Sequence, residues 1–162
     1  MASSRGTLER LYEAFGRGDG ATMASCYARD AHFADPVYPN LHGPQVGAMW
    51  RMLTGRSQDL TVQVRSLTAD EHTGSATWLA HYSFGADRRP VANLVRSSFV
   101  FTDGLVSDER DVFDFHAWAA MALGPKGRLL GWTSYLRTAV QRRAAEQLRD
   151  FMAAADEEPS GQ

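Results

Sequence analysis

Residues 99–115 read FVFTDGLVSDERDVFDF, with apolar residues at alternate positions on either side of an Asp103-Gly104 pair. A period of two is typical of a strand that buries one of its faces. An Asp-Gly pair between two such runs favours the tight turn of a β-hairpin, because both positions tolerate positive φ. The segment therefore predicts two antiparallel strands, over residues 91–101 and 105–115.

The hairpin is the end of a longer series of elements. Two further alternating runs precede it, at residues 60–67 and 76–84, with turn residues between them. Before these strands the apolar spacing is helical at residues 8–15, and shorter signals predict a second helix over 19–27 and a third from residue 44. Helices followed by consecutive hairpin-connected strands predict an α+β fold, with three N-terminal helices packed on a curved antiparallel sheet.

The chain has 162 residues, which suits one domain. We expect residues 1–123 to form the α+β domain, 124–155 a C-terminal helical extension of it, and 156–162 a disordered tail. The main helix of the extension is expected over residues 133–155, where an apolar stripe consists of Leu136, Val140, Ala144, Leu148 and Phe151. Two roles are open for this extension. In the first, which is structural, the helix covers apolar surface of the sheet or extends a dimer. In the second, Leu129, Leu130 and Trp132 close the mouth of a pocket.

Charge and hydropathy argue against nucleic-acid and membrane partners. The chain carries 17 basic and 19 acidic residues, a net charge of −2. The C-terminal helix has four arginines, which are expected to form its solvated face rather than a phosphate site: Arg137, Arg142, Arg143 and Arg149. No apolar run approaches the ~18 residues of a membrane span, and the N-terminus lacks the pattern of a signal peptide. A cytoplasmic protein is the expectation.

The motifs of metal and nucleotide chemistry are missing from the sequence. Cys26 is the single cysteine, and the five histidines have no recognised metal-ligand spacing. The glycine-rich residues 16–20 lack the Gly-Lys-Ser/Thr ending of a phosphate loop. We therefore expect neither a metal ion nor a cofactor.

Two acids stand on a face that is otherwise apolar. Glu109 and Asp111 alternate with outward residues and so share a strand face with Phe113 and Phe115. A carboxylate in an apolar setting has a raised pKa unless it is partnered, which brings it toward the range useful for proton transfer. The alternative is that both acids pair with arginines such as Arg96 or Arg110 on neighbouring positions.

Asp35 is a third acid with apolar neighbours, within Phe33-Ala34-Asp35-Pro36-Val37. An Asp-Pro pair is also a common turn, so this residue is open to a purely structural interpretation. Large aromatic side chains accompany the acids on helix and strand faces. These aromatics either fill the core or line an apolar cavity, and periodicity does not separate the two: Trp50, Trp78, Tyr82, Phe99 and Phe113.

Residues 8–123 resemble the nuclear transport factor 2-like superfamily, which includes ketosteroid isomerases, SnoaL-like polyketide cyclases and limonene epoxide hydrolases. The resemblance rests on FGRGD at 15–19, YARDAHFADPV at 27–37, FVFTDGLV at 99–106 and ERDVFD at 109–114. It implies a cone-shaped α+β barrel whose sheet curls around a pocket. It also implies a homodimer formed through the outer face of the sheet.

The resemblance assigns roles to individual residues. Asp35 matches the general base of the ketosteroid isomerases, whereas Leu11 and Ser97 stand where those enzymes have the oxyanion-hole tyrosine and aspartate. Tyr12 is one residue off the tyrosine position. Asp111 is similar to the acid or base of the polyketide cyclases and epoxide hydrolases. The epoxide hydrolases also use an arginine and an aspartate on the strand where this chain has Ala80 and Tyr82.

The resulting hypothesis is a cofactor-independent acid/base enzyme of isomerase, cyclase or epoxide-hydrolase type, which acts on a hydrophobic small molecule. Asp111 and Asp35 would be its catalytic residues. The substrate-binding candidates are the residues expected to orient Asp111 or to form the pocket walls: Glu109, Tyr82, Trp50, Trp78, Ser97, Phe99 and Phe113. The alternative is a non-catalytic small-molecule-binding or dimeric adaptor protein of the same fold.

Overall fold

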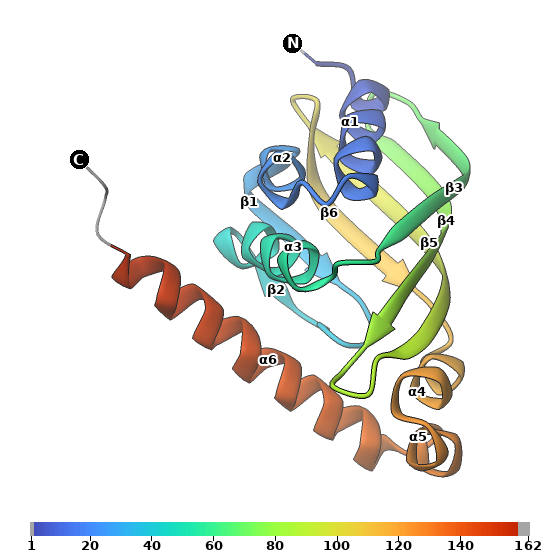
Figure 1. Ribbon diagram of the computed structural model, residues 1–162. Helices are drawn as coiled ribbons and strands as arrows, with labels where there is room; N and C mark the ends of the chain where they lie inside the picture. Colours follow the sequence, from blue (N-terminus) through green and yellow to red (C-terminus); the bar gives the residue numbers. More distant parts are fainter. Residues whose placement is uncertain (1, 159–162) are drawn as a thin grey trace.

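A computed structural model describes residues 2–158 and shows the expected α+β architecture (Figure 1). Three helices and one curved, unclosed six-stranded sheet enclose the core, and a helical extension follows the last strand. The helices are α1 (Ser4–Gly16), α2 (Gly20–Ser25), α3 (Pro44–Arg56), α4 (Phe115–Leu123), α5 (Pro125–Leu130) and α6 (Ser134–Glu157). The strands are β1 (Tyr27–Ala34), β2 (Leu41–His42), β3 (Thr61–Ala69), β4 (Thr73–Phe84), β5 (Arg89–Thr102) and β6 (Leu105–Val112).

The β5–β6 hairpin forms as the Asp-Gly pair predicts. Asp103 and Gly104 have φ values of 52° and 79°, and Thr102 pairs with Leu105 across the turn. Because β5 alternates strictly between buried and exposed residues, its inward face carries Asn93, Ser97 and Phe99. The hairpin therefore fixes which side chains reach the concave side of the sheet.

The sheet differs from the expected purely antiparallel one at β1. This strand starts at Tyr27, where the second helix was expected to end, and it pairs in parallel with β6. The strand order is β2-β1-β6-β5-β4-β3, so the first strand lies beside the last. A parallel neighbour needs a long crossover rather than a hairpin, and such pairing leaves no turn signal in the sequence.

The core fills the space between the concave face of the sheet and the three N-terminal helices. Leu8 of α1, Phe33 of β1 and Met49 of α3 are all completely buried there. No helix in residues 2–158 has both the length and the apolar composition that crossing a membrane requires.

The extension packs on α3 and lines the cavity with residues of α6, and its expected contribution to a dimer stays a prediction. In Figure 1, α6 runs alongside α3 across the open end of the sheet. Ala144 and Leu148 are buried in the main core, whereas Leu136 is buried in a second cluster with Phe115 and Trp118 of α4. Leu129 and Trp132 are 71% and 75% exposed, so closure by these side chains is wrong. The helix also continues through Asp156 and Glu157, where a disordered tail was expected, and the rest of that expected tail, residues 159–162, lies outside the described part of the chain.

Replacing Leu148 with alanine should destabilise the protein because it removes a buried contact that holds α6 in place. We expect the free energy of unfolding in urea to fall by about 2–4 kcal/mol. The neighbouring Arg149→Ala is the matched control, since Arg149 is exposed and its loss should change stability by less than about 0.5 kcal/mol. Equal effects of the two substitutions would show that α6 is not docked as described.

Candidate active site

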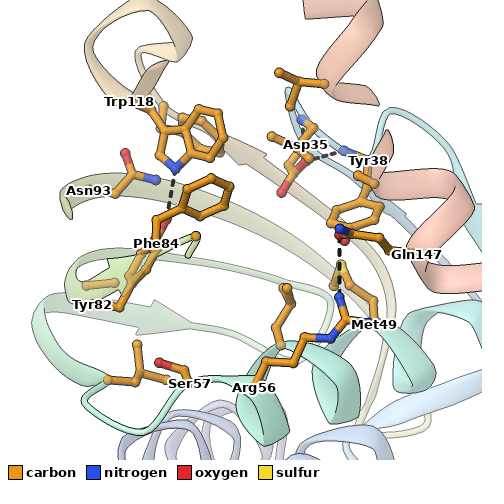
Figure 2. A pocket seen from close by; sticks show the side chains of 18 of the residues that line it. Asp35, Tyr38, Met49, Arg56, Ser57, Tyr82, Phe84, Asn93, Trp118 and Gln147 are labelled. Carbon is orange, nitrogen blue, oxygen red and sulfur yellow. Dashed lines mark hydrogen bonds between the residues drawn. The ribbon is translucent and has the colours of Figure 1, made fainter. Parts of the chain in front are cut away.

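A cavity of about 810 Å³ lies between the concave side of the sheet, α3, α4 and α6 (Figure 2). Its walls are mainly apolar and aromatic, and its ionisable residues separate by sign. Asp35 and Asp111 are the acids among its described lining residues, whereas the bases are Arg56, Arg88, Lys126 and Arg143. A large apolar pocket with a few convergent polar groups is the usual form of a small-molecule site.

The parallel pairing of β1 with β6 brings the two acids of the cavity together. Phe33 pairs with Glu109 and Ala34 with Arg110, so Asp35 leaves β1 at the level of Asp111. Because alternate residues of a strand face the same side, Glu109 and Asp111 both point inward from β6. Asp35 and Asp111 therefore enter the cavity from neighbouring strands of one sheet.

Asp111 is a buried acid with an incomplete set of partners. Its Oδ1 atom is buried and accepts no hydrogen bond from any described residue. Burial, with a smaller contribution from the charge of Asp35, raises the pKa of Asp111 to about 7 against the opposing effects of the Ser97 hydroxyl and the Glu109 carboxyl. Near neutral pH this carboxyl can therefore hold or release a proton with little change in free energy.

Glu109 lies behind Asp111 and completes a chain of buried polar groups. The Tyr27 hydroxyl donates to Glu109 Oε2 at 2.5 Å and accepts a hydrogen bond from Trp50 Nε1 at 2.8 Å. Burial and the charge of Asp111 hold the pKa of Glu109 well above its usual range, which favours its protonated form. A protonated Glu109 beside Asp111 favours the ionised form of Asp111 and fixes its position.

Arginine does not neutralise these acids, so the alternative interpretation of Glu109 and Asp111 is wrong. Arg110 lies on the outer face of the sheet, where its Nε atom is 3.4 Å from Asp108. Arg96 is likewise exposed on the outer face of β5. Both arginines alternate with the buried residues and so face away from the acids.

Asp35 combines the structural and the functional interpretations. Its Oδ1 atom accepts hydrogen bonds from the backbone N–H groups of Val37 and Tyr38 at 2.7 and 2.6 Å, as in an Asp-Pro turn. Burial nevertheless raises the pKa of Asp35 to about 6 against the effect of these two donors. Asp35 also lines the cavity, where Figure 2 shows its carboxyl pointing inward.

The remaining sequence candidates divide into two groups. Trp50, Trp78, Tyr82 and Phe113 line the cavity. Ser97, Phe99 and Glu109 are buried behind that wall and are not among its described lining residues. Trp78 Nε1 donates to Ser97 Oγ at 2.8 Å, which ties the wall to the layer beneath it. The second group is therefore placed to position its neighbours rather than to touch a ligand.

Tyr12, which the resemblance placed one residue off the tyrosine position, is buried behind the cavity wall and is not among its described lining residues. Its ring packs against Trp78 and Phe99, and its buried hydroxyl has no hydrogen-bond partner among the described residues. The pKa of Tyr12 is raised well above 10 by burial and by the charges of Glu109 and Asp111, so its hydroxyl stays protonated beside the acids. In the sequence, the position of Tyr12 on the apolar face of α1 was the feature that indicated its burial.

Asn93 and Trp118 are further cavity residues that sequence reasoning missed. Asn93 faces inward from β5 and is 9% exposed, and Figure 2 shows it near Trp118 and Phe84. Trp118 Nε1 donates to the Tyr82 hydroxyl at 2.8 Å. A polar residue at a buried position of the alternating strand 91–101 was the signal for Asn93, since apolar residues surround it.

A model of the SnoaL-like domain matches residues 8–109. The chain therefore belongs to the SnoaL-like family. The match spans the three N-terminal helices and the strands up to Glu109 of β6, and so includes Asp35. No curated protein matches the chain. In residues 2–158, no cluster of three or more His, Cys, Asp or Glu side chains is arranged to hold a metal ion.

Solved structures share the fold of this SnoaL-like protein at low identity. An epoxide hydrolase of the LEH-like type from M. tuberculosis is 19% identical with a TM-score of 0.62, over 78% of this chain and 92% of that one. A putative isomerase from Rhodopseudomonas palustris is 16% identical with a TM-score of 0.58, over 73% and 96%. A hypothetical protein with a ketosteroid isomerase-like fold from Catenulispora acidiphila, in complex with trimethylamine, is 11% identical with a TM-score of 0.65, over 78% and 96%.

The family and its structural neighbours thus include enzymes. On β4 of this SnoaL-like protein, Ala80 and Tyr82 face the cavity where the resemblance to epoxide hydrolases implies an arginine and an aspartate. Among the described lining residues of the cavity, the carboxylic acids are Asp35 and Asp111.

Proposed function

We propose that this SnoaL-like protein is a cofactor-independent acid/base enzyme that acts on a hydrophobic small molecule in the cavity. The observation that carries the proposal is the pair Asp35 and Asp111, which line one apolar cavity and have pKa values near 6 and 7. Buried carboxyls with pKa values moved toward neutrality are characteristic of sites that transfer protons.

The two pKa values support different roles for the two acids. Near pH 7 Asp35 is mostly ionised, and about half of Asp111 is protonated. Asp35 would take a proton from a carbon or from water, while protonated Asp111 donates to the substrate oxygen on which negative charge develops. For a ketone, the two proton transfers give a neutral enol, protonated Asp35 and ionised Asp111. The reverse transfers restore the ketone and the starting protonation states of both acids. In isomerisation the proton returns from Asp35 to a different carbon of the enol. In an aldol cyclisation the enol carbon attacks a second carbonyl, whose oxygen takes the proton held by Asp35 while the enol O–H returns its proton to Asp111. In epoxide opening Asp35 takes a proton from the attacking water and Asp111 donates one to the epoxide oxygen, and a proton then passes from Asp35 to Asp111 directly or through water.

Other residues support these two roles. Glu109, held by Tyr27, positions Asp111 from behind. The carboxamide of Asn93 and the hydroxyl of Tyr82 offer hydrogen bonds to substrate oxygens from the wall, while Trp50, Trp78 and Phe113 exclude water. A preorganised donor in a dry cavity stabilises developing charge more than the same donor does in water.

The exchange of α-hydrogens of β-tetralone in deuterated buffer tests the proposal with a small apolar ketone. We expect the wild-type protein to accelerate exchange, measured by proton NMR, and Asp35→Asn to lower this acceleration by about 10²–10⁴-fold. Conversion of indene oxide to its diol in isotopically labelled water tests the epoxide branch with the same variants. If both compounds bind but neither reacts faster than in buffer, the non-catalytic binding protein becomes the better description.

We also propose that a second copy of the chain covers the outer face of the sheet. Leu94, Val100 and Val112 are exposed there, with Val112 at 65%. Burial of exposed apolar side chains at the core of an interface is typical of homodimers. Sedimentation analysis should give the mass of a dimer for the wild type and of a monomer for Leu94→Glu/Val112→Glu. A monomeric wild type would refute this assembly and leave the cavity chemistry unaffected.

A further inference from the structure

All four basic residues of the cavity belong to different elements. Arg56 ends α3, Arg88 lies in the β4–β5 turn, Lys126 is in the first turn of α5, and Arg143 lies in the middle of α6. All four are exposed, whereas Asp111 is buried and Asp35 is half-buried in the interior of the cavity. The cavity therefore has an acidic interior and a basic rim.

Arg56 and Arg143 lie on the same side of the rim. Arg56 donates to the neutral Oε1 atom of Gln147 at 3.4 Å, a contact visible in Figure 2. Gln147 follows Arg143 by one turn of α6, so the two residues share a face of that helix. Both arginines, with Gln147, are therefore presented by α3 and α6 to the same part of the opening.

The rim cations are poorly neutralised by the protein itself. In the described part of the chain, Arg56, Lys126 and Arg143 form no salt bridge, and Arg88 has one long contact, 3.8 Å from Asp59. Asp59 is also engaged by Ser83, whose backbone N–H and hydroxyl both donate to it. The basic side chains are thus available to a group that arrives from outside.

Arg143 contrasts with the other arginines of α6. Arg137 is committed to a cation–π contact, 5.0 Å above the Phe115 ring, and Arg142 and Arg149 are exposed away from the cavity. The sequence pattern placed all four on a solvated face, but Arg143 lies beside Ala144, which lines the cavity.

We infer that the ligand of this cavity is an apolar molecule with one anionic group, which Arg56 and Arg143 bind at the rim while the apolar part reaches Asp35 and Asp111. This inference names the substrate class of the proposed function and rests on the same cavity. Guanidinium groups bind carboxylate, sulfonate and phosphate oxygens through paired N–H donors, so these groups share one recognition chemistry. Anchoring the anionic end would keep it away from the acids and orient the reacting end toward them.

Two fluorescent probes with the same aromatic skeleton test the inference. Anilinonaphthalene sulfonate carries one negative charge, and phenylnaphthylamine is its neutral counterpart. We expect the wild type to bind both, each displacing the other. Arg56→Gln and Arg143→Gln should each weaken binding of the sulfonate about 3-fold, and the double variant about 10-fold, with the neutral probe unchanged. High salt should weaken only the sulfonate.

Arg142→Gln is the matched control, because it removes the same charge from the adjacent residue of α6, outside the cavity lining. It should leave the affinity for both probes within about twofold. The inference is overturned if Arg142→Gln and Arg143→Gln weaken the sulfonate equally, if the rim variants weaken both probes alike, or if the probes do not displace each other. Replacing the sulfonate probe by a naphthyl carboxylate and a naphthyl phosphate then shows which anion the rim prefers.

The outcome is independent of the proton chemistry. Loss of sulfonate selectivity with retained β-tetralone exchange would refute the anionic ligand and leave the proposed function standing. Retained selectivity with neither β-tetralone exchange nor indene oxide opening would refute the enzyme and leave a binding site for apolar anions.

Discussion

Asp111→Asn is expected to lower the rate of β-tetralone exchange by about 10²–10⁴-fold while leaving the affinity for the ketone nearly unchanged. An asparagine keeps the size of the side chain but does not release or accept the proton that Asp111, with its pKa near 7, transfers. The rate and the dissociation constant are measured separately, by NMR exchange and by displacement of phenylnaphthylamine.

The matched control for this substitution is Asp108→Asn on the same strand. Asp108 faces away from the cavity, where it contacts His32 and Arg110, so its loss should leave exchange unchanged. A fall in rate of the same size in both variants would point to a general disturbance of β6. Full activity in Asp111→Asn would contradict the assignment of this residue as a proton donor.

The same substitution is expected to stabilise the folded protein at pH 8. The pKa of Asp111 is about 7 when folded, against about 3.9 in an unfolded chain, so the folded state binds more protons between these values. Stability therefore falls as pH rises from about 4 to about 7, and the loss is complete above the folded pKa. Asp35, with a folded pKa near 6, adds a smaller loss of the same sign.

Asparagine removes this cost because it stays neutral. At about 1.4 kcal/mol per pKa unit, Asp111→Asn should raise the free energy of unfolding at pH 8 by roughly 2–4 kcal/mol. Urea unfolding at pH 8 and pH 4 provides the measurement, and the acidic sample is the internal control, since there the wild-type acids are already protonated. Destabilisation by Asp111→Asn at both pH values would mean that Asp111 is held by partners in its charged form. In that case the substitution would cost stability at the pH at which activity requires the charged carboxyl.

The sequence predicted those parts of the fold that depend on local pattern. The Asp103-Gly104 turn and the alternation of β5 are local properties, and both formed as expected. In β6 the expected alternation holds over residues 109–112, but Val106 is buried beside a register shift and the strand ends at Val112, because Phe115 already begins α4. The same alternation correctly placed Glu109 and Asp111 on the buried face. A period of two shows which face of the strand a residue occupies, but not whether that residue lines a cavity. The pattern therefore did not distinguish Asp111, which lines the cavity, from Glu109, which lies behind it.

The parts that the sequence did not predict depend on contacts between distant segments. The parallel pairing of β1 with β6 brings Asp35 to Asp111, but no turn residue signals it. The docking of α6 on α3 likewise has no local signal, since the apolar stripe of α6 fits any apolar surface. This docking places the exposed Arg143 at the rim of the cavity.

Titration of the aspartate side-chain carboxyl carbons by carbon-13 NMR tests the central claim most directly, because it reports protonation without any substrate. Asp35→Asn and Asp111→Asn assign the two signals. The account predicts midpoints near pH 6 for Asp35 and near pH 7 for Asp111. Midpoints below about 4.5 for both residues, as in exposed aspartates, would contradict the claim that this cavity holds two acids ready to exchange protons at neutral pH.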